Sequence, residues 1–261
     1  MFDGIFLDLL LMLMAVLIDI AALVIGILIT TSKIKSTKIL GIGYIISAAL
    51  GFISDSLFIL RSTLKSPELV ASMSPVNTVL SFMATVAGLI CICLFIHRNY
   101  GYKWIYFPLL AQPVASAVST VVLRVVLIRI CGNDQYIAGT GLSAAIISLI
   151  LGSVEALILI LVFYKNRKAE KIIPHAWIIR IVSFCCSLIL TVSTIIFYGK
   201  CFAAGAKGDN LYFALINKFT MFQYCFSVFL SLVGLVMPIY ILVMAKKAEK
   251  QPEETAAYIE D

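Results

Sequence analysis

The sequence contains few charged residues. Aspartate, glutamate, lysine and arginine make up 13% of its 261 residues, whereas 62% are hydrophobic and the mean hydropathy is +1.06. A soluble globular domain carries about twice that share of charge, and its wet surface leaves no room for so many apolar side chains. The scarcity of charge therefore excludes an ordinary soluble fold and indicates an integral membrane protein, whose outer surface faces lipid.

Residues and motifs that usually carry catalysis or bind metals are also scarce. There are two histidines, no CxxC pair, no H-E-x-x-H or G-x-S-x-G motif and no glycine-rich phosphate loop. The sequence therefore predicts neither an enzyme nor a metal or cofactor site. The net charge of +6 does not predict nucleic-acid binding, because the basic residues fall in short gaps rather than along one long face.

Apolar residues instead form seven continuous runs. A helix that crosses a bilayer needs about 20 mostly apolar residues, and each run is long enough. The runs cover residues 4–30, 39–61, 76–97, 104–130, 140–164, 175–198 and 219–245. Membrane β-strands would instead show about ten residues of alternating character. The predicted fold is all-α, a polytopic membrane helix bundle of about seven transmembrane helices.

The chain is expected to form one transmembrane domain, residues 1–246, followed by a short polar cytoplasmic tail, residues 247–261. The first run has no basic segment before it and no small-residue cleavage site after it, so we interpret it as a retained helix rather than a signal peptide. The longest gap, 199–218, contains three glycines and is predicted to be an outer loop.

Lysine and arginine are divided unevenly between the two sides of the bundle. Twelve lie in the first, third and fifth gaps and the tail, and six lie in the other gaps or at the ends of the runs beside them. By the positive-inside rule, the N-terminus is then outside and the C-terminus is cytoplasmic. The expected location is the plasma or cytoplasmic membrane.

Small and polar residues line one side of each run, because positions three and four apart share a helix face. In the first three runs these stripes are Asp8, Met12, Ala15, Asp19, Ala22 and Gly26; Tyr44, Ser47, Ala48, Gly51, Ser54 and Asp55; and Asn77, Ser81, Ala84, Gly88 and Cys91. Such stripes predict seams where helices pack closely. A polar cavity at some depth is the alternative interpretation.

Four ionisable residues lie well inside the runs, namely Asp19, Asp55, Arg124 and Glu155. Each would cost at least about 2.5–3.5 kcal/mol if it faced lipid, so each should face the bundle interior. We predict an outward-facing pocket for a proton, a sodium ion or a small cationic ligand, with the candidate residues Asp8, Asp19, Asp55, Arg124, Glu155, Gln223 and Tyr224. The alternative is one buried Asp–Arg pair with the remaining carboxyls neutral and no ligand.

Three further side chains carry separate expectations. Cys131 and Cys201 fall in gaps predicted to lie outside, so they are candidates for a disulfide between two outer loops. Arg180, near the inner end of its run, is expected to extend to the interface and has no predicted role.

The helix count and two short segments resemble known families. The segment 234–240, with Pro238 and Tyr240, resembles the proline–tyrosine motif of rhodopsin-like heptahelical receptors, although Met237 replaces the asparagine before the proline. Seven-helix input modules of bacterial sensor proteins share the same layout. The segment 35–37, Lys-Ser-Thr, is similar to one in the sugar-transporting SWEET family. These resemblances imply a seven-helix fold with the N-terminus outside, and no functional residue is transferred from them.

Three functions are compatible with these features. The outer charges and the lack of enzymatic motifs favour a receptor-like or sensory protein that passes an external event to a cytoplasmic or membrane partner. A small transporter or channel that uses the intramembrane carboxylates is the first alternative. A non-catalytic subunit of a membrane complex is the second.

Overall fold

The computed structural model describes residues 2–63, 67–130, 133–169, 172–208 and 211–250, and every regular element in this part of the chain is helical. The elements are α1 (Phe2–Thr31), α2 (Lys38–Thr63), α3 (Pro67–Tyr100), the short 3₁₀ helix η1 (Lys103–Ile105), α4 (Tyr106–Ile130), α5 (Asn133–Lys165), α6 (Ala176–Gly205), α7 (Leu211–Gly234) and α8 (Val236–Lys250).

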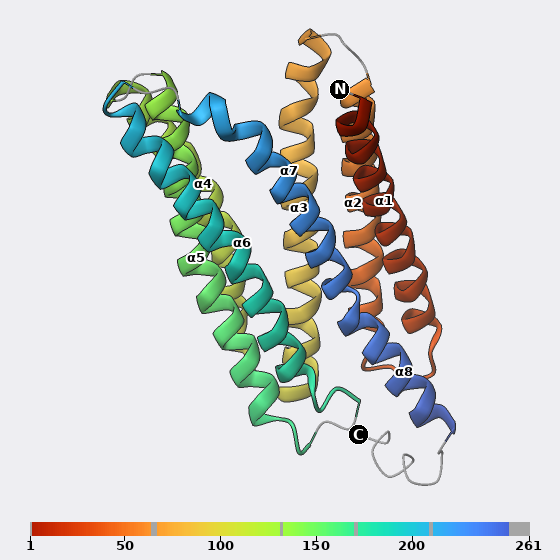
Figure 1. Ribbon diagram of the computed structural model, residues 1–261. Helices are drawn as coiled ribbons and strands as arrows, with labels where there is room; N and C mark the ends of the chain where they lie inside the picture. The colour runs from red at the N-terminus through yellow and green to blue at the C-terminus, as the bar shows by residue number, and fades with distance from the viewer. Residues whose placement is uncertain (1, 64–66, 131–132, 170–171, 209–210, 251–261) are drawn as a thin grey trace. The chain divides into compact units, whose positions relative to one another are not determined.

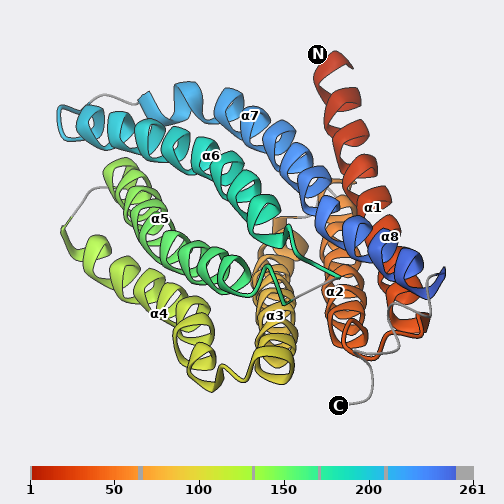
Figure 2. The same cartoon turned by 90° about the horizontal axis from the view of Figure 1, so that it is seen from below.

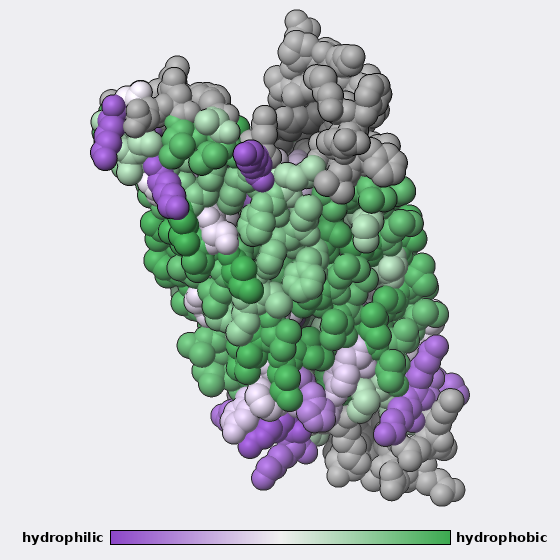
Figure 3. Space-filling view, in the orientation of Figure 1, coloured by the Kyte–Doolittle hydropathy of each residue, from purple (hydrophilic) through white to green (hydrophobic). Residues whose placement is uncertain are grey.

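Seven helical stretches of the described chain are long and apolar enough to cross a membrane. They are Leu10–Thr31, Lys38–Leu57, Val79–Tyr100, Lys103–Leu123, Gln135–Lys165, Ala176–Gly205 and Ala214–Glu249. Apolar residues cover the middles of the helices, and hydrophilic residues gather at their ends (Figure 3). The prediction of an all-α, multi-pass integral membrane protein is confirmed. The last stretch joins α7 to α8, and α8 extends to Lys250, past the predicted start of the tail at residue 247.

The chain divides into two compact units. The first contains the described residues up to Leu110, those from Phe163 to Ala176 and those from Ser231 onward. It therefore holds α1, α2, α3, η1 and α8 (Figure 1). The second contains Ala111–Val162 and Trp177–Leu230, which are most of α4 to α7.

Small residues set the packing of the first unit. There α2 lies between α1 and α3, and α8 packs against α1 (Figure 2). A Cβ placed on Gly26 of α1 would lie only 3.0 Å from the backbone nitrogen of Ile45 on α2. On the other side of α2, the Ser47 hydroxyl donates to the carbonyl of Ala84 on α3 at 3.1 Å. The seams predicted for the first three helices therefore do face one another.

Aromatic residues join the helices of the second unit. The ring of Tyr198 on α6 occupies the space that a side chain at Gly141 of α5 would need. The adjacent Phe197 stacks on Phe219 of α7 with ring centroids 3.9 Å apart. Aromatic pairs of this kind add to the energy gained from area burial alone. Two neighbouring residues of α6 thus contact α5 and α7.

The predicted outer loop over residues 199–218 is wrong in its extent. Helix α6 continues to Gly205, and α7 begins at Leu211. A Cβ on Gly205 would lie 3.3 Å from Gln135 of α5, so this glycine allows close helix packing rather than a chain reversal. The turn comes later, at Gly208, whose φ of +83° is a conformation that glycine adopts without steric cost.

The seventh span is interrupted near Pro238. Helix α7 ends at Gly234, and α8 begins after a single residue, Leu235. The amide of Leu235 is shared between the carbonyls of Ser231, at 3.2 Å, and Leu232, at 3.1 Å. Proline has no N–H, so it cannot donate to the Gly234 carbonyl four residues earlier. The missing donor explains why the helix is interrupted at this point.

Candidate functional site

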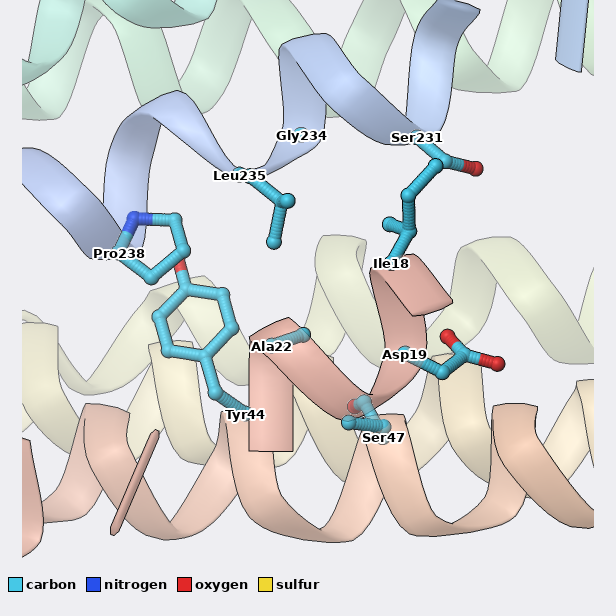
Figure 4. A pocket seen from close by; sticks show the side chains of 10 residues that line it. Ile18, Asp19, Ala22, Tyr44, Ser47, Ser231, Gly234, Leu235 and Pro238 are labelled. Atoms are coloured by element: carbon cyan, nitrogen blue, oxygen red, sulfur yellow. The ribbon is translucent and has the colours of Figure 1, made fainter. Parts of the chain in front are cut away.

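A cavity of about 180 Å³ lies within the first unit, between α1, α2 and the junction of α7 with α8 (Figure 4). Its polar lining consists of Asp19, Tyr44, Ser47 and Ser231, with Gly234 beside them. Asp19 is twelve residues from the end of α1, about 18 Å along the helix axis. The cavity therefore lies near the middle of a hydrocarbon core about 30 Å thick.

The carboxyl group of Asp19 rests directly on the backbone of α2. A Cβ placed on Gly51 would lie 3.0 Å from both carboxylate oxygens, so only glycine permits this approach. The Oδ2 atom of Asp19 is buried and has no hydrogen-bond partner among the described residues. A charged oxygen in that position costs free energy unless something neutralises it.

A second carboxyl group lies nearby. Asp55 follows Gly51 by one helical turn on α2, and it is close enough to Asp19 for the two to interact electrostatically. Next to it, the hydroxyls of Ser54 and Ser81 lie 3.5 Å apart and link α2 to α3. Two carboxylates that share a poorly solvated region repel each other, so a proton or cation bound at either one lowers the energy of both.

The helix break lies beside the cavity and leaves one backbone carbonyl without its α-helical donor. Gly234 lines the cavity, and its carbonyl has no α-helical donor because the residue four positions on is Pro238. This carbonyl lies at the C-terminal, negative end of α7. Broken transmembrane helices present such carbonyls to cations in other membrane proteins. The Tyr44 ring extends across the cavity towards Pro238 (Figure 4).

The polar side chains that line this mainly apolar cavity all carry oxygen, and Asp19 is the one carboxyl group among them. Ser47 already uses its hydrogen in the bond to Ala84, so it offers only lone pairs to the cavity. No group of three or more His, Cys, Asp or Glu side chains is placed to hold a metal ion in the described part of the chain. Carboxylate, hydroxyl and carbonyl oxygens are the ligands that hard cations prefer. A single carboxylate suits a monovalent cation better than a divalent one.

Glu155 has a partner that the sequence pattern did not suggest. It interacts electrostatically with Arg180 of α6, and both residues belong to the second unit. The Nε atom of Arg180 is buried without a hydrogen-bond acceptor among the described residues, so this part of the side chain does not reach the interface as expected. In a poorly solvated region, removing either partner of such a pair destabilises the protein, because the other charge is left uncompensated.

The other predicted pocket residues are distributed as follows. The Gln223 amide nitrogen lies 3.5 Å from the hydroxyl of Thr194, joining α7 to α6, and Tyr224 is half-buried on α7. Both belong to the second unit, whereas Asp19 and Asp55 belong to the first. The side chains of Asp8 and Arg124 lie outside the part of the chain that the structure describes.

The candidate disulfide stays a prediction. Cys201 is buried within α6 rather than lying in an exposed loop, and it has no disulfide partner among the described residues. Cys131 lies outside those residues. Burial in an apolar helix is the usual setting of an unreactive thiol.

Comparison with protein-family models, with curated proteins and with solved structures gives no match for this chain. The features that sequence reasoning did not assign to a site are Ser47, Ser231, the Gly234 carbonyl and the Tyr44 ring. Tyr44 and Ser47 lie on a predicted stripe, but only the adjacency of α1, α2 and the α7–α8 junction brings all four residues close to Asp19.

Proposed function

We propose that the protein is a non-enzymatic, receptor-like or sensory membrane protein in which a small monovalent cation, Na⁺ or H⁺, binds at Asp19. The observation that carries this proposal is the buried Oδ2 atom of Asp19, which has no hydrogen-bond partner among the described residues. Asp19 borders a mainly apolar cavity whose polar residues are Asp19, Tyr44, Ser47 and Ser231. An anionic oxygen at mid-membrane is stable only when a proton or a cation neutralises it.

The size of the cavity supports a small ligand. A water molecule occupies about 30 Å³ of liquid, so the cavity of about 180 Å³ has room for roughly six water-sized groups. Pockets for drug-sized molecules begin at about 300 Å³. A cation with a few water molecules, or a very small cationic group, fits these limits, whereas a larger organic ligand does not.

The position of the cavity supports a sensory role. It borders Leu235 and Pro238 at the helix break, and α8 continues from there along α1. At the far end of α8, the Glu249 carboxylate accepts a hydrogen bond from the Lys33 backbone at 2.6 Å. A cation that binds one geometry of the helix break more tightly increases the population of that geometry. Because α8 continues from the break, the change is passed to the end of the unit where Lys33 and Glu249 lie.

The first test compares wild type with Asp19→Asn in mild detergent, with Na⁺ replaced by choline. At a hundredfold excess over the Kd, Na⁺ stabilises the folded state by about 2.7 kcal/mol, which corresponds to a rise of about 5–10 °C in the unfolding midpoint. We expect this rise in wild type and its loss in Asp19→Asn. Lower pH should shrink the rise in wild type, because protons and Na⁺ compete for the same carboxyl group.

Glu155→Gln is the matched control, because it removes a carboxylate from the second unit and leaves the cavity intact. It should keep the full response to Na⁺. If the midpoint of wild type is the same in Na⁺ and choline at every pH, Na⁺ binding at Asp19 is wrong. If, in addition, wild type and Asp19→Asn show the same dependence on pH, proton binding at Asp19 is wrong too. If Asp19→Asn responds like wild type, the ion binds elsewhere.

A transporter is the second candidate, and the break in the seventh span beside the cavity favours it, since transporters often bind ions where helices are discontinuous. Proteoliposomes separate the two functions. Sodium uptake that depends on Asp19 would identify a transporter, whereas binding without flux would support the sensory role. Co-purification of a membrane protein in a fixed ratio would instead favour a non-catalytic subunit.

We also propose that the N-terminus is outside and the C-terminus is cytoplasmic, because the basic gaps lie at one end of the spans. A reporter fused after Lys250 tests this orientation in a bacterial host. Green fluorescent protein should fluoresce there, because it matures in the cytoplasm. Alkaline phosphatase should stay inactive, because it matures only on the outer side of the membrane. An active phosphatase fusion would reverse the assignment.

A further inference from the structure

One end of the first unit carries a dense set of positive charges. The described basic residues at this end are Lys33, Lys35, Lys38, Arg98, Lys103, Lys165, Arg167, Lys168, Lys246 and Lys247. Most of these side chains are exposed. Among the described residues, the acidic side chain at this end is Glu249, and its carboxylate already accepts a hydrogen bond from the Lys33 backbone. Among the side chains that the structure describes at this end, positive charge is therefore in large excess.

At this end, the segment after α3 places an aromatic ring against a lysine from α5. Gly101, with φ of +73°, ends α3, and its amide donates to the carbonyl of His97 at 2.9 Å. The chain then continues into Tyr102 and Lys103, at the start of η1. From the end of α5, the ammonium group of Lys165 lies over the Tyr102 ring, 5.4 Å from its centroid. A cation–π contact of this kind holds the ammonium in place while leaving its donors available.

A second cation is fixed beside the first. The Arg167 guanidinium stacks on the ring of Tyr164 at 3.7 Å from its centroid and donates to the Tyr164 carbonyl at 2.8 Å. Guanidinium groups bind phosphate oxygens well because their donors form a planar fork. We name Tyr102, Lys103, Trp104, Lys165 and Arg167 together the basic–aromatic surface.

Exposed apolar side chains adjoin these cations. Trp104 is 57% exposed and Phe107 is 83% exposed, and both lie at the end of a membrane span. Tryptophan prefers the headgroup level of a bilayer. A ligand for this region therefore meets fixed positive charge on one side and apolar rings on the other. An amphiphile fulfils both conditions, whereas inorganic phosphate has no apolar part that could contact the rings.

We propose that the basic–aromatic surface binds the phosphate headgroup of an anionic phospholipid, with the lipid tail against Trp104 and Phe107. Clusters of lysine and arginine next to a span attract anionic lipids, each basic residue strengthening binding by roughly fivefold. The second unit offers exposed Lys200 and Lys207, but no cation–π contact is found at either in the described part of the chain. The site therefore belongs to the first unit.

The test uses Trp104 as a local reporter of lipid contact. The sequence has two tryptophans, so Trp177→Phe leaves Trp104 as the single emitter. This variant is reconstituted in phosphatidylcholine bilayers that contain either brominated phosphatidylglycerol or brominated phosphatidylcholine. Bromine quenches only tryptophans in contact with the lipid that carries it. We expect stronger quenching by the brominated anionic lipid, and we expect Lys103→Gln/Lys165→Gln to weaken its binding by roughly 30-fold.

The matched control is Lys200→Gln/Lys207→Gln, which removes the same charge from the second unit and should leave the quenching unchanged. Equal quenching by the two brominated lipids in the Trp177→Phe background would overturn the proposal. So would an equal loss in both double variants, which would point to net charge rather than to a site. A full loss of the preference when inorganic phosphate replaces chloride at equal ionic strength would identify a free-anion site instead.

Discussion

Replacing Gly41 with leucine should destabilise the protein by about 3 kcal/mol or more, which lowers the unfolding midpoint by about 6–12 °C. A Cβ at this position would lie 2.9 Å from the backbone nitrogen of Thr30 and 2.9 Å from the carbonyl oxygen of Gly26. Both atoms belong to the backbone of α1 and cannot move aside as a flexible side chain would. Thermal unfolding in mild detergent measures the change.

Gly152→Leu provides the matched control for this prediction. Gly152 also lies within a membrane-spanning helix, but a Cβ there would meet no heavy atom within 4 Å. The same substitution should therefore leave the midpoint within about 2 °C of wild type. If the two variants unfold at the same temperature, close contact of small residues does not hold α1 against α2.

Arg180→Met should destabilise the second unit by about 3 kcal/mol. The substitution removes the cation that interacts with Glu155 and leaves the carboxylate in a poorly solvated position. Glu155→Gln should cost less, because a neutral amide needs no counter-charge. The double variant, Glu155→Gln/Arg180→Met, should recover most of the stability lost in Arg180→Met, since it contains neither charge.

A double-mutant cycle checks this expectation. The four proteins are unfolded under one set of conditions, and the coupling energy is taken from the difference between the double variant and the sum of the single variants. We expect about 2 kcal/mol of coupling. Additive effects would show that Glu155 and Arg180 contribute independently to the free energy of unfolding. Their electrostatic interaction would then not stabilise the protein.

The spans were predictable because lipid imposes a simple requirement. Every backbone polar group in the hydrocarbon must be satisfied within its own helix or a closed barrel, so long apolar runs specify helices almost regardless of context. Helix ends are less constrained. Gly205 looked like part of a loop, yet it lies in α6, because its closeness to Gln135 is a tertiary contact that no local pattern reveals.

The site was predictable in part. Asp19 and Asp55 stood out because charge is expensive in a membrane, and the helix break followed from the missing N–H of Pro238. The partners of these groups depend on which helices are neighbours. Glu155 was grouped with the aspartates by sequence, whereas it interacts with Arg180 in the second unit, because opposite charges at the same depth attract wherever the packing allows.

The shared amide of Leu235 gives the seventh span an adjustable length. Its bond to Ser231 has the spacing of an α-helix, and its bond to Leu232 has that of a 3₁₀-helix. An α-helix rises about 1.5 Å per residue and a 3₁₀-helix about 2.0 Å. Exchanging one hydrogen bond for the other over a three-residue turn lengthens the span by about 1.5 Å. Exchange between the two acceptors therefore moves α8 along its axis by a fraction of a helical turn, and no turn has to unfold.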